Sequence, residues 1–316
     1  MIKKYNEFIS SEQSICPLCL DRYMETYYIK NIKESLNFKI SSLQVSVPLK
    51  GCINNCRSCI AKVSGEDNII FKNLSKDIDF DNQYLEKLKL IKNQKCKNIV
   101  ITSDKGEPIQ NKPFMRKLGE FNKELDNWFN FEIQTTGVLL NDQNLGFMKD
   151  VVGIKTISLS VFDIFDDQNN LNIIGVKENT GFNLKDICRS IKNYGFILRL
   201  SINLINSYDR HPIDKIFQKI EELDPNQVTF KNLWHTEEDN AINKWIKVNK
   251  ASSNIINKIS EYLEENNGHK VSNYRYEFNG KSIWMVDNCM LGNYLILRPD
   301  AKIYRSWESI SPIENL

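Results

Sequence analysis

The segment Leu43–Cys59 has the sequence LQVSVPLKGCINNCRSC, and it is the strongest indication of the fold. It begins with an apolar run of β type, Leu43–Val47, and continues into a polar loop that holds Cys52, Cys56 and Cys59. The spacing is Cys-x3-Cys-x2-Cys. Thiolates are preferred ligands of iron–sulfur clusters, and three of them on one short loop can face a common point. Three ligands leave one metal position open, and an open position is a place for chemistry.

Two other interpretations of these cysteines fit the sequence less well. Thiols of an apolar core lie on apolar faces, whereas these lie in a loop with Gly51, Asn54 and Arg57. A zinc site would need a fourth ligand, and no Cys or His occurs between Cys59 and Cys96. The sequence therefore favours an iron–sulfur site.

Apolar runs of β type alternate with segments of helical period along most of the chain. The expected strands are 43–47, 99–101, 131–135, 156–161, 196–204 and 227–230. Six β–α units in a row predict a parallel sheet with helices outside it, either open and doubly wound or a closed or partial barrel. In each of these architectures, functional residues gather at the C-terminal ends of the strands.

The chain after residue 233 has a different pattern. A helix is expected from Ser253 to Leu263. Asn279-Gly280 joins two β-like runs, which is the strongest short signal for a hairpin. A second hairpin is expected around Pro299-Asp300. These segments predict a small C-terminal α/β extension.

The three-cysteine loop behind a first strand resembles the radical S-adenosylmethionine (radical SAM) superfamily. The resemblance implies a partial (β/α)6 TIM-like barrel at about residues 40–233, between an N-terminal extension, 1–39, and a C-terminal one, 234–316. It implies a [4Fe–4S] cluster on Cys52, Cys56 and Cys59, with SAM on the fourth iron. An electron from a ferredoxin or flavodoxin would cleave SAM to a 5′-deoxyadenosyl radical, which abstracts hydrogen from the substrate. Ser58 replaces the aromatic residue that many members have before the third cysteine, so the adenine must pack elsewhere.

Further candidates for SAM lie where the next strands end. Gly106 and Glu107 resemble the end of the family's Gly-Gly-Glu motif, which binds the SAM amino group, although Lys105 replaces the first glycine. Thr135 lies in a segment that resembles the Thr-Asn-Gly often found after the third strand.

Two expected strands carry polar residues at alternate positions, which share a face: Ser158 and Ser160, then Arg199, Ser201 and Asn203. A strand buried on both faces should be almost wholly apolar, so the pattern predicts a wet or ligand-filled interior, unless these strands are half exposed. By resemblance, Ser160 and Asn203 would bind the SAM ribose and methionine carboxylate. Arg199 could pair with a carboxylate bidentately. Thr229 and Lys231 are further candidates on the sixth strand.

Three cysteines near the two ends of the chain suggest an accessory site. Cys289 resembles the start of the SPASM and Twitch extensions of radical SAM enzymes, where cysteines bind auxiliary clusters. Here Ala301 replaces the turn glycine, and Ser306 stands where the second cysteine is expected, so the hairpin could be kept while the cluster is lost. Cys16 and Cys19 form a Cys-x2-Cys pair, which is often half of a zinc or iron–sulfur site. A second metal site through these cysteines is one expectation, and free thiols are the alternative.

The composition excludes several classes of protein. The chain of 316 residues has 42 Lys+Arg against 40 Asp+Glu, so bulk charge does not hold it to nucleic acid or a membrane. Eight Cys against three His argue against a zinc enzyme built on imidazoles. Cys96 and Cys188 look like packing residues. No signal peptide or membrane span is evident, which predicts the cytoplasm, where thiols stay reduced.

The resemblance as a whole implies a radical SAM enzyme, and it leaves the substrate open. The tail suggests a peptide or protein side chain that is modified after synthesis. The alternative is a nucleotide or other small molecule in cofactor or modified-base synthesis. A third alternative is a non-catalytic iron–sulfur or metal-binding protein that keeps the fold.

Overall fold

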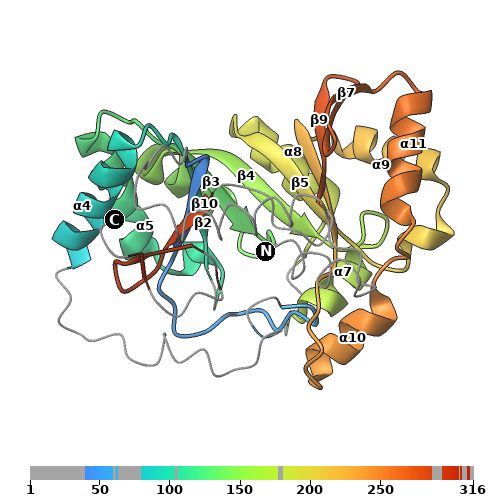
Figure 1. The fold of residues 1–316 in the computed structure, drawn as a ribbon, viewed down its shortest axis with the longest axis horizontal. Coiled ribbons are helices and arrows are strands. Elements are labelled where there is room, and N and C mark those ends of the chain that lie inside the picture. Colours follow the sequence, from blue (N-terminus) through green and yellow to red (C-terminus); the bar gives the residue numbers. More distant parts are fainter. Residues whose placement is uncertain are drawn as a thin grey trace, which may run out of the picture.

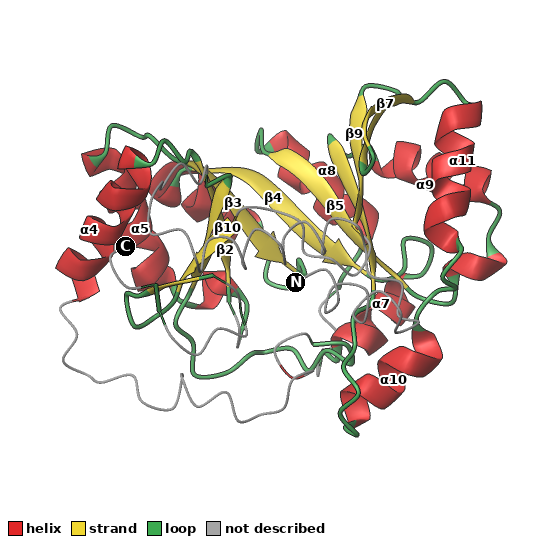
Figure 2. Cartoon of the chain, viewed as in Figure 1, coloured by secondary structure: helices red, strands yellow, loops and turns green. Residues whose placement is uncertain are grey.

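A single mixed sheet forms the centre of the protein (Figure 2). The structure is a computed structural model, and it describes residues 40–59, 62, 80–103, 106–176, 181–286, 294–305, 307 and 312–313. The sheet order is β11-β10-β1-β2-β3-β4-β5-β6-β9-β8-β7. The strands are β1 (Ser42–Ser46), β2 (Asn98–Thr102), β3 (Asn130–Thr135), β4 (Ile154–Val161), β5 (Ile197–Leu204), β6 (Gln227–Asn232), β7 (His269–Ser272), β8 (Arg275–Phe278), β9 (Lys281–Val286), β10 (Tyr294–Leu297) and β11 (Ile303–Tyr304).

Helices connect the strands and cover the outer face of the sheet (Figure 1). The α-helices are α4 (Phe80–Asn93), α5 (Lys112–Glu124), α6 (Asp142–Gly146), α7 (Asp167–Ile174), α8 (Leu184–Asn193), α9 (Ile213–Leu223), α10 (Ala241–Asn249) and α11 (Ile255–Glu265). Two 3-10 turns, Pro108–Gln110 and Tyr208–Arg210, and a π-helix, Phe147–Val152, complete the connections.

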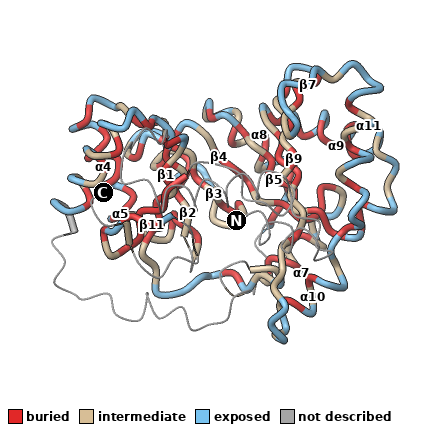
Figure 3. Tube along the Cα trace, in the orientation of Figure 1, coloured by how far each residue is buried: buried red, intermediate tan, exposed pale blue. Residues whose placement is uncertain are grey.

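The two faces of the sheet differ in burial (Figure 3). On β5, the outward side chains Leu198, Leu200 and Ile202 are fully buried under helices. The inward side chains Arg199 and Asn203 are only half-buried. The same alternation recurs on β3 and β9, because a strand points successive side chains to opposite faces. The inner face is therefore polar and in part exposed, which fits both the predicted wet or ligand-filled interior and the alternative of half-exposed strands.

All six expected core strands are present, and their bounds differ from the predictions by two residues or fewer. Strands β1 to β6 pair in parallel in chain order, as six consecutive β–α units require. The described part of the sheet is open and is not closed into a complete barrel. The expected mixed α/β fold is confirmed.

The predicted C-terminal hairpins are present and are built into the same sheet. Strand β9 pairs in parallel with β6, and β10 pairs in parallel with β1. These additions cover both edges of the six-stranded core, where unpaired backbone groups would otherwise be exposed. At the second turn Ala301 has a φ of 57°, the left-handed conformation that glycine usually supplies. The hairpin is kept without the glycine, whereas Cys289 and Ser306 lie outside the described residues.

No helix among the described residues is long and apolar enough to cross a membrane. Cys96 and Cys188 are buried in the core, as predicted.

Candidate functional site

The cysteine loop lies at the C-terminal end of β1. Cys52 is exposed, and Cys56 and Cys59 are partly buried; all three are free thiols. The backbone amide of Asn54 donates to the Cys52 Sγ at 3.3 Å, and that of Cys59 donates to the Cys56 carbonyl at 3.3 Å. Across the described residues, no three His, Cys, Asp or Glu side chains converge on a single metal ion. A [4Fe–4S] cluster needs a different arrangement, because each cysteine binds its own iron.

The loop is fixed to the C-terminal end of α7. The amides of Asn55 and Arg57 donate to the carbonyls of Ile174 and Ile173 at 3.0 and 2.9 Å. Gly175 follows α7 with a φ of +69°, and a Cβ built there would lie 2.4 Å from the Asn55 carbonyl oxygen. This glycine allows the helix end and the cysteine loop to approach. Gly175 is the C-cap of α7, and the sequence contains no sign of its close contact with the cysteine loop.

Substitution of Gly175 by alanine tests this contact. The left-handed conformation costs an alanine about 1–2 kcal/mol, and the new methyl group also pushes the cysteine loop away. Gly153→Ala is the matched control, since Gly153 has a φ of +80° and its Cβ would meet nothing within 4 Å. Both variants should unfold at a lower temperature, but only Gly175→Ala should retain less iron after anaerobic reconstitution. Equal iron in the two variants would contradict the role given to Gly175.

Burial governs the protonation of the central cysteine. Burial raises the pKa of Cys56 to about 12, and the nearby Cys59, Glu107 and Cys52 add to the rise. In the protein without metal this thiol is therefore protonated at neutral pH. Metal binding must displace that proton, because the thiolate is the ligand.

Glu107 joins the ends of β2 and β3 to the cysteine loop. Its buried carboxylate accepts hydrogen bonds from the Thr135 hydroxyl (2.6 Å), the Thr136 hydroxyl (2.6 Å), the Thr136 amide (3.0 Å) and the Asn54 side chain (3.1 Å). Three of these reach Oε1, and only Thr135 reaches Oε2. Among the described residues no cation pairs with Glu107. Gly106 packs against the segment before Cys52, since a Cβ there would lie 2.4 Å from Leu49 Cδ1 and 3.2 Å from the Gly51 oxygen.

The structure thus brings Gly106, Glu107 and Thr135 to the cysteine loop. Asn54 and Thr136 also donate hydrogen bonds to this carboxylate. The sequence did not predict this role for either residue. The available signals were a polar residue inside the cysteine motif and a second threonine directly after Thr135.

The polar residues of β4 and β5 lie on the inner face, but not all near the cysteine loop. Ser158 is buried, Ser160 is half-buried, and Asn203 donates to the Val161 carbonyl at 3.3 Å. Arg199 lies four residues before Asn203, about 13 Å nearer the start of the strand. Its Nη1 contacts both oxygens of Glu132 at 2.7 and 2.6 Å. Arg199 therefore contacts a carboxylate within the protein through one nitrogen, and its expected bidentate pairing with a bound carboxylate stays a prediction.

Two buried polar atoms of the loop itself are left for a bound group. Within the described structure, Asn54 Oδ1 and Ser58 Oγ are buried without a hydrogen-bond partner. Such atoms normally have partners, so each indicates a ligand or water. Together with three thiols and a carboxylate that lacks a counter-ion, they fit a cluster and a small polar, cationic cofactor.

A cavity of about 440 Å³ adjoins the cysteine loop. Arg57 lines it from the loop, Asn206 and Arg210 line it from the segment after β5, and Trp245 lines it from α10. The cysteine loop, α7, the segment after β5 and α10 thus meet around one accessible space.

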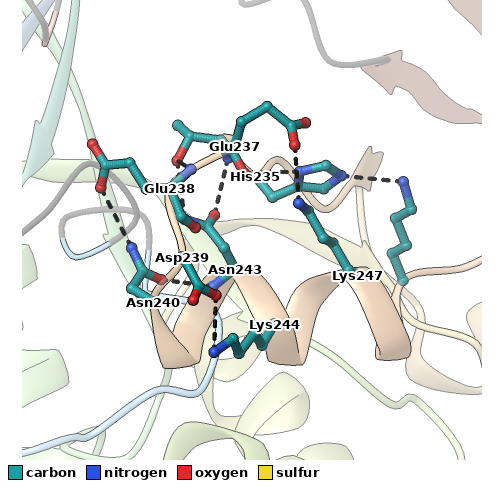
Figure 4. A network of polar contacts seen from close by, with 10 residues as sticks. His235, Glu237, Glu238, Asp239, Asn240, Asn243, Lys244 and Lys247 are labelled. Atoms are coloured by element: carbon teal, nitrogen blue, oxygen red, sulfur yellow. Dashed lines mark hydrogen bonds and ion pairs between the residues drawn. The ribbon is translucent and has the colours of Figure 1, made fainter.

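The segment between β6 and α10 is held by its own polar network (Figure 4). The Thr236 amide donates to Asn243 Oδ1 at 2.9 Å. The two ring nitrogens of His235 lie 3.3 Å from the Thr236 carbonyl oxygen and 3.3 Å from Lys250 Nζ. The imidazole is thus engaged within its own segment. The accessory-site candidates Cys16, Cys19 and Cys289 lie outside the described residues, and a second metal site stays a prediction.

Comparison with known proteins identifies the family. The model of the radical SAM superfamily matches residues 46–220, more than half of the chain, and this range includes the cysteine loop and strands β2 to β5. No curated protein sequence matches. Native anSMEcpe with bound AdoMet has a similar fold, with a TM-score of 0.54 and 14% identity over 84% of this chain and 74% of that one. Native anSMEcpe with bound AdoMet and Kp18Cys peptide gives 0.58 and 15%, over 85% and 75%.

Identities this low show the fold alone, whereas the family match covers the motif and most of the core. The chain therefore belongs to the radical SAM superfamily and is a radical SAM enzyme.

Proposed function

We propose that Cys52, Cys56 and Cys59 hold a [4Fe–4S] cluster, that SAM binds at its open iron, and that the enzyme modifies a peptide or protein side chain. The observation that carries this proposal is Glu107. Burying a carboxylate without a nearby cation costs free energy unless a ligand supplies a positive charge. This carboxylate is bonded through Asn54 to the loop that carries the cysteines.

The residues around the cluster have distinct proposed roles toward SAM. Oε2 of Glu107 accepts one hydrogen bond, and a carboxylate oxygen can accept two, so it has room for the SAM ammonium group. Thr135 orients this carboxylate, and Gly106 allows the turn to lie against the loop. Ser160 and Asn203, on neighbouring strands, would bind the ribose and the methionine carboxylate. Ser158 would support them from the inner face of β4.

When bound, the reduced cluster and SAM supply a 5′-deoxyadenosyl radical that abstracts a hydrogen atom. The protein would hold the reacting groups in place. Cys52 and its neighbour Ile53 are exposed, which gives a ferredoxin or flavodoxin an edge of the site to approach.

The peptide substrate is supported by likeness of fold. The solved structure that holds AdoMet and the Kp18Cys peptide has the same strand framework at a TM-score of 0.58. The concave inner face here is half-buried and polar on β3, β4 and β5, which suits a chain segment entering from one side.

The test is SAM cleavage by the holoenzyme. Protein reconstituted anaerobically with iron and sulfide should, with SAM and dithionite, form 5′-deoxyadenosine, measured by liquid chromatography and mass spectrometry. The control omits dithionite and should form none. Protein that carries a full cluster but forms no 5′-deoxyadenosine would contradict the proposal.

A further inference from the structure

Among the charged side chains at the inner-face positions of the described strands, Lys231 is the one that forms no ion pair. The inner-face positions of strands β1 to β6, β9 and β8 include Glu132, Arg199, Lys231, Arg275 and Glu277. Arg199 pairs with Glu132 at 2.6 Å, and Arg275 pairs with Glu277 at 2.5 Å. The ammonium group of Lys231 has no hydrogen bond or ion pair in the described structure.

The position of Lys231 places this charge beside the proposed SAM site. In the register of the sheet, Lys231 on β6 is opposite Asn203 on β5 and Val286 on β9. These three strands are neighbours in the sheet, in the order β5-β6-β9. Burial lowers the pKa of Lys231; the Glu132 carboxylate opposes this change, and Arg199 adds to it. A half-buried cation without a partner is unfavourable, so the fold keeps here a charge that a ligand can neutralise.

A second observation points to a ligand at the same place. Ser201 lies on the inner face two residues before Asn203; it is 1% exposed, and its hydroxyl has no hydrogen-bond partner in the described structure. Thr229 lies opposite Ser201 in the register, and Trp284 lies opposite Thr229. An orphaned hydroxyl donor beside an unpaired ammonium group suits an oxygen acceptor with negative charge. Trp284 adds an aromatic side chain to the same region of the inner face.

We propose that Lys231, assisted by Ser201, binds a carboxylate of the substrate on the inner face of the sheet. The inference rests on the proposed function and narrows its substrate to a peptide segment with an acidic side chain or a C-terminal carboxylate near the modified residue. One uncompensated positive charge matches a carboxylate monoanion. A phosphate dianion would call for further cations or a helix N-terminus, and among the described residues the further cation near Lys231 is Arg199, which already pairs with Glu132.

A direct binding test does not require turnover. The holoenzyme with SAM is acetylated with isotopically labelled acetic anhydride, and the rate at Lys231 is measured by mass spectrometry. The probes are N-acetylglutamate N-methylamide and its glutamine counterpart, with inorganic phosphate as a third. The glutamate probe should slow acetylation of Lys231, the glutamine probe should not, and Lys247, which pairs with Glu237, should be unaffected by either. Equal rates with both probes, or protection by phosphate alone, would overturn the proposal.

A catalytic test asks whether Lys231 selects the substrate. Peptides from a randomised pool that are modified by the holoenzyme are remade with Gln or Asn in place of Glu or Asp. Wild type should prefer the acidic member of each pair by a factor of about 30 or more in kcat/KM, since truncating one partner of a buried charge pair costs 2–5 kcal/mol. Lys231→Gln should lose this preference through KM, and Lys231→Arg should retain part of it.

The outcomes separate this inference from the proposed function. If 5′-deoxyadenosine never forms but the glutamate probe protects Lys231, the carboxylate site is supported and the proposed SAM cleavage is contradicted. If 5′-deoxyadenosine forms and Lys231→Gln keeps the preference for acidic peptides, only the carboxylate site is contradicted. A Lys231→Gln variant that binds SAM more than about tenfold more weakly, a loss of 1.4 kcal/mol, would assign the lysine to the carboxylate of SAM and also overturn the inference.

Discussion

Replacement of Cys56 by alanine should leave a folded protein that holds no [4Fe–4S] cluster and forms no 5′-deoxyadenosine. Cys56 is partly buried, whereas Cys52 is exposed, and burial raises the pKa of Cys56 to about 12. With two cysteines left, the cluster lacks one of its three proposed protein ligands. Iron and sulfide content, the visible absorption of the cluster and 5′-deoxyadenosine formation should all fall to background.

The matched control is Cys188→Ala. Cys188 is also a free thiol, but it is buried on α8 against the outer face of the sheet. This variant should lose about 1 kcal/mol of stability through lost packing and keep its cluster. If Cys56→Ala kept a full complement of iron, or if Cys188→Ala lost it, the assignment of the cluster to the loop would be wrong.

Replacement of Glu107 by glutamine should have the second largest effect. The side-chain amide would present an N–H group where the carboxylate now accepts hydrogen bonds from Thr135 and Thr136. A buried donor or acceptor left unsatisfied costs about 1–3 kcal/mol, so the melting temperature should fall by several degrees. The variant also loses the negative charge proposed to meet the SAM ammonium group. SAM affinity should therefore fall by a factor of about ten or more, since a hydrogen bond to a charged group contributes 1.5–3 kcal/mol.

Two comparisons separate these effects. Glu120→Gln changes an exposed carboxylate on α5 and should alter stability by less than about 0.5 kcal/mol. Thr135→Val removes one donor to Glu107 but keeps the charge, so it should lower stability more than SAM affinity. Calorimetry with SAM measures the dissociation constants, and thermal unfolding measures the stability. A Glu107→Gln variant that binds SAM as tightly as wild type would contradict the role given to Glu107.

Much of the fold was predictable because its signals are local. Each core strand is a short apolar run between helical periods, and the Asn279-Gly280 turn has the positive φ values expected of such a hairpin. The three-cysteine site was predicted from the spacing and placement of the cysteines, and it stays a prediction. Alternate polar residues on β4 and β5 indicated a polar inner face, and the structure has these residues on one face with mixed burial.

The parts that sequence reasoning missed depend on contacts between distant segments. The pairing of β9 with β6 and of β10 with β1 is fixed by which sheet edges are open, and no local pattern encodes this. The approach of Gly175 to Asn55 joins two loops that are far apart in the sequence. Arg199 has the period expected of an inner-face residue, but Glu132, two strands away, takes its guanidinium.

In the proposed site, the cysteine loop leaves one iron of the cluster free for SAM. Electron–nuclear double resonance on the reduced holoenzyme, with SAM that carries ¹⁵N in its amino group, tests whether SAM binds this iron. Chelation of the open iron predicts a ¹⁵N coupling to the cluster, which should be absent in Cys56→Ala. A reduced cluster that shows no ¹⁵N coupling while SAM is bound would contradict the account.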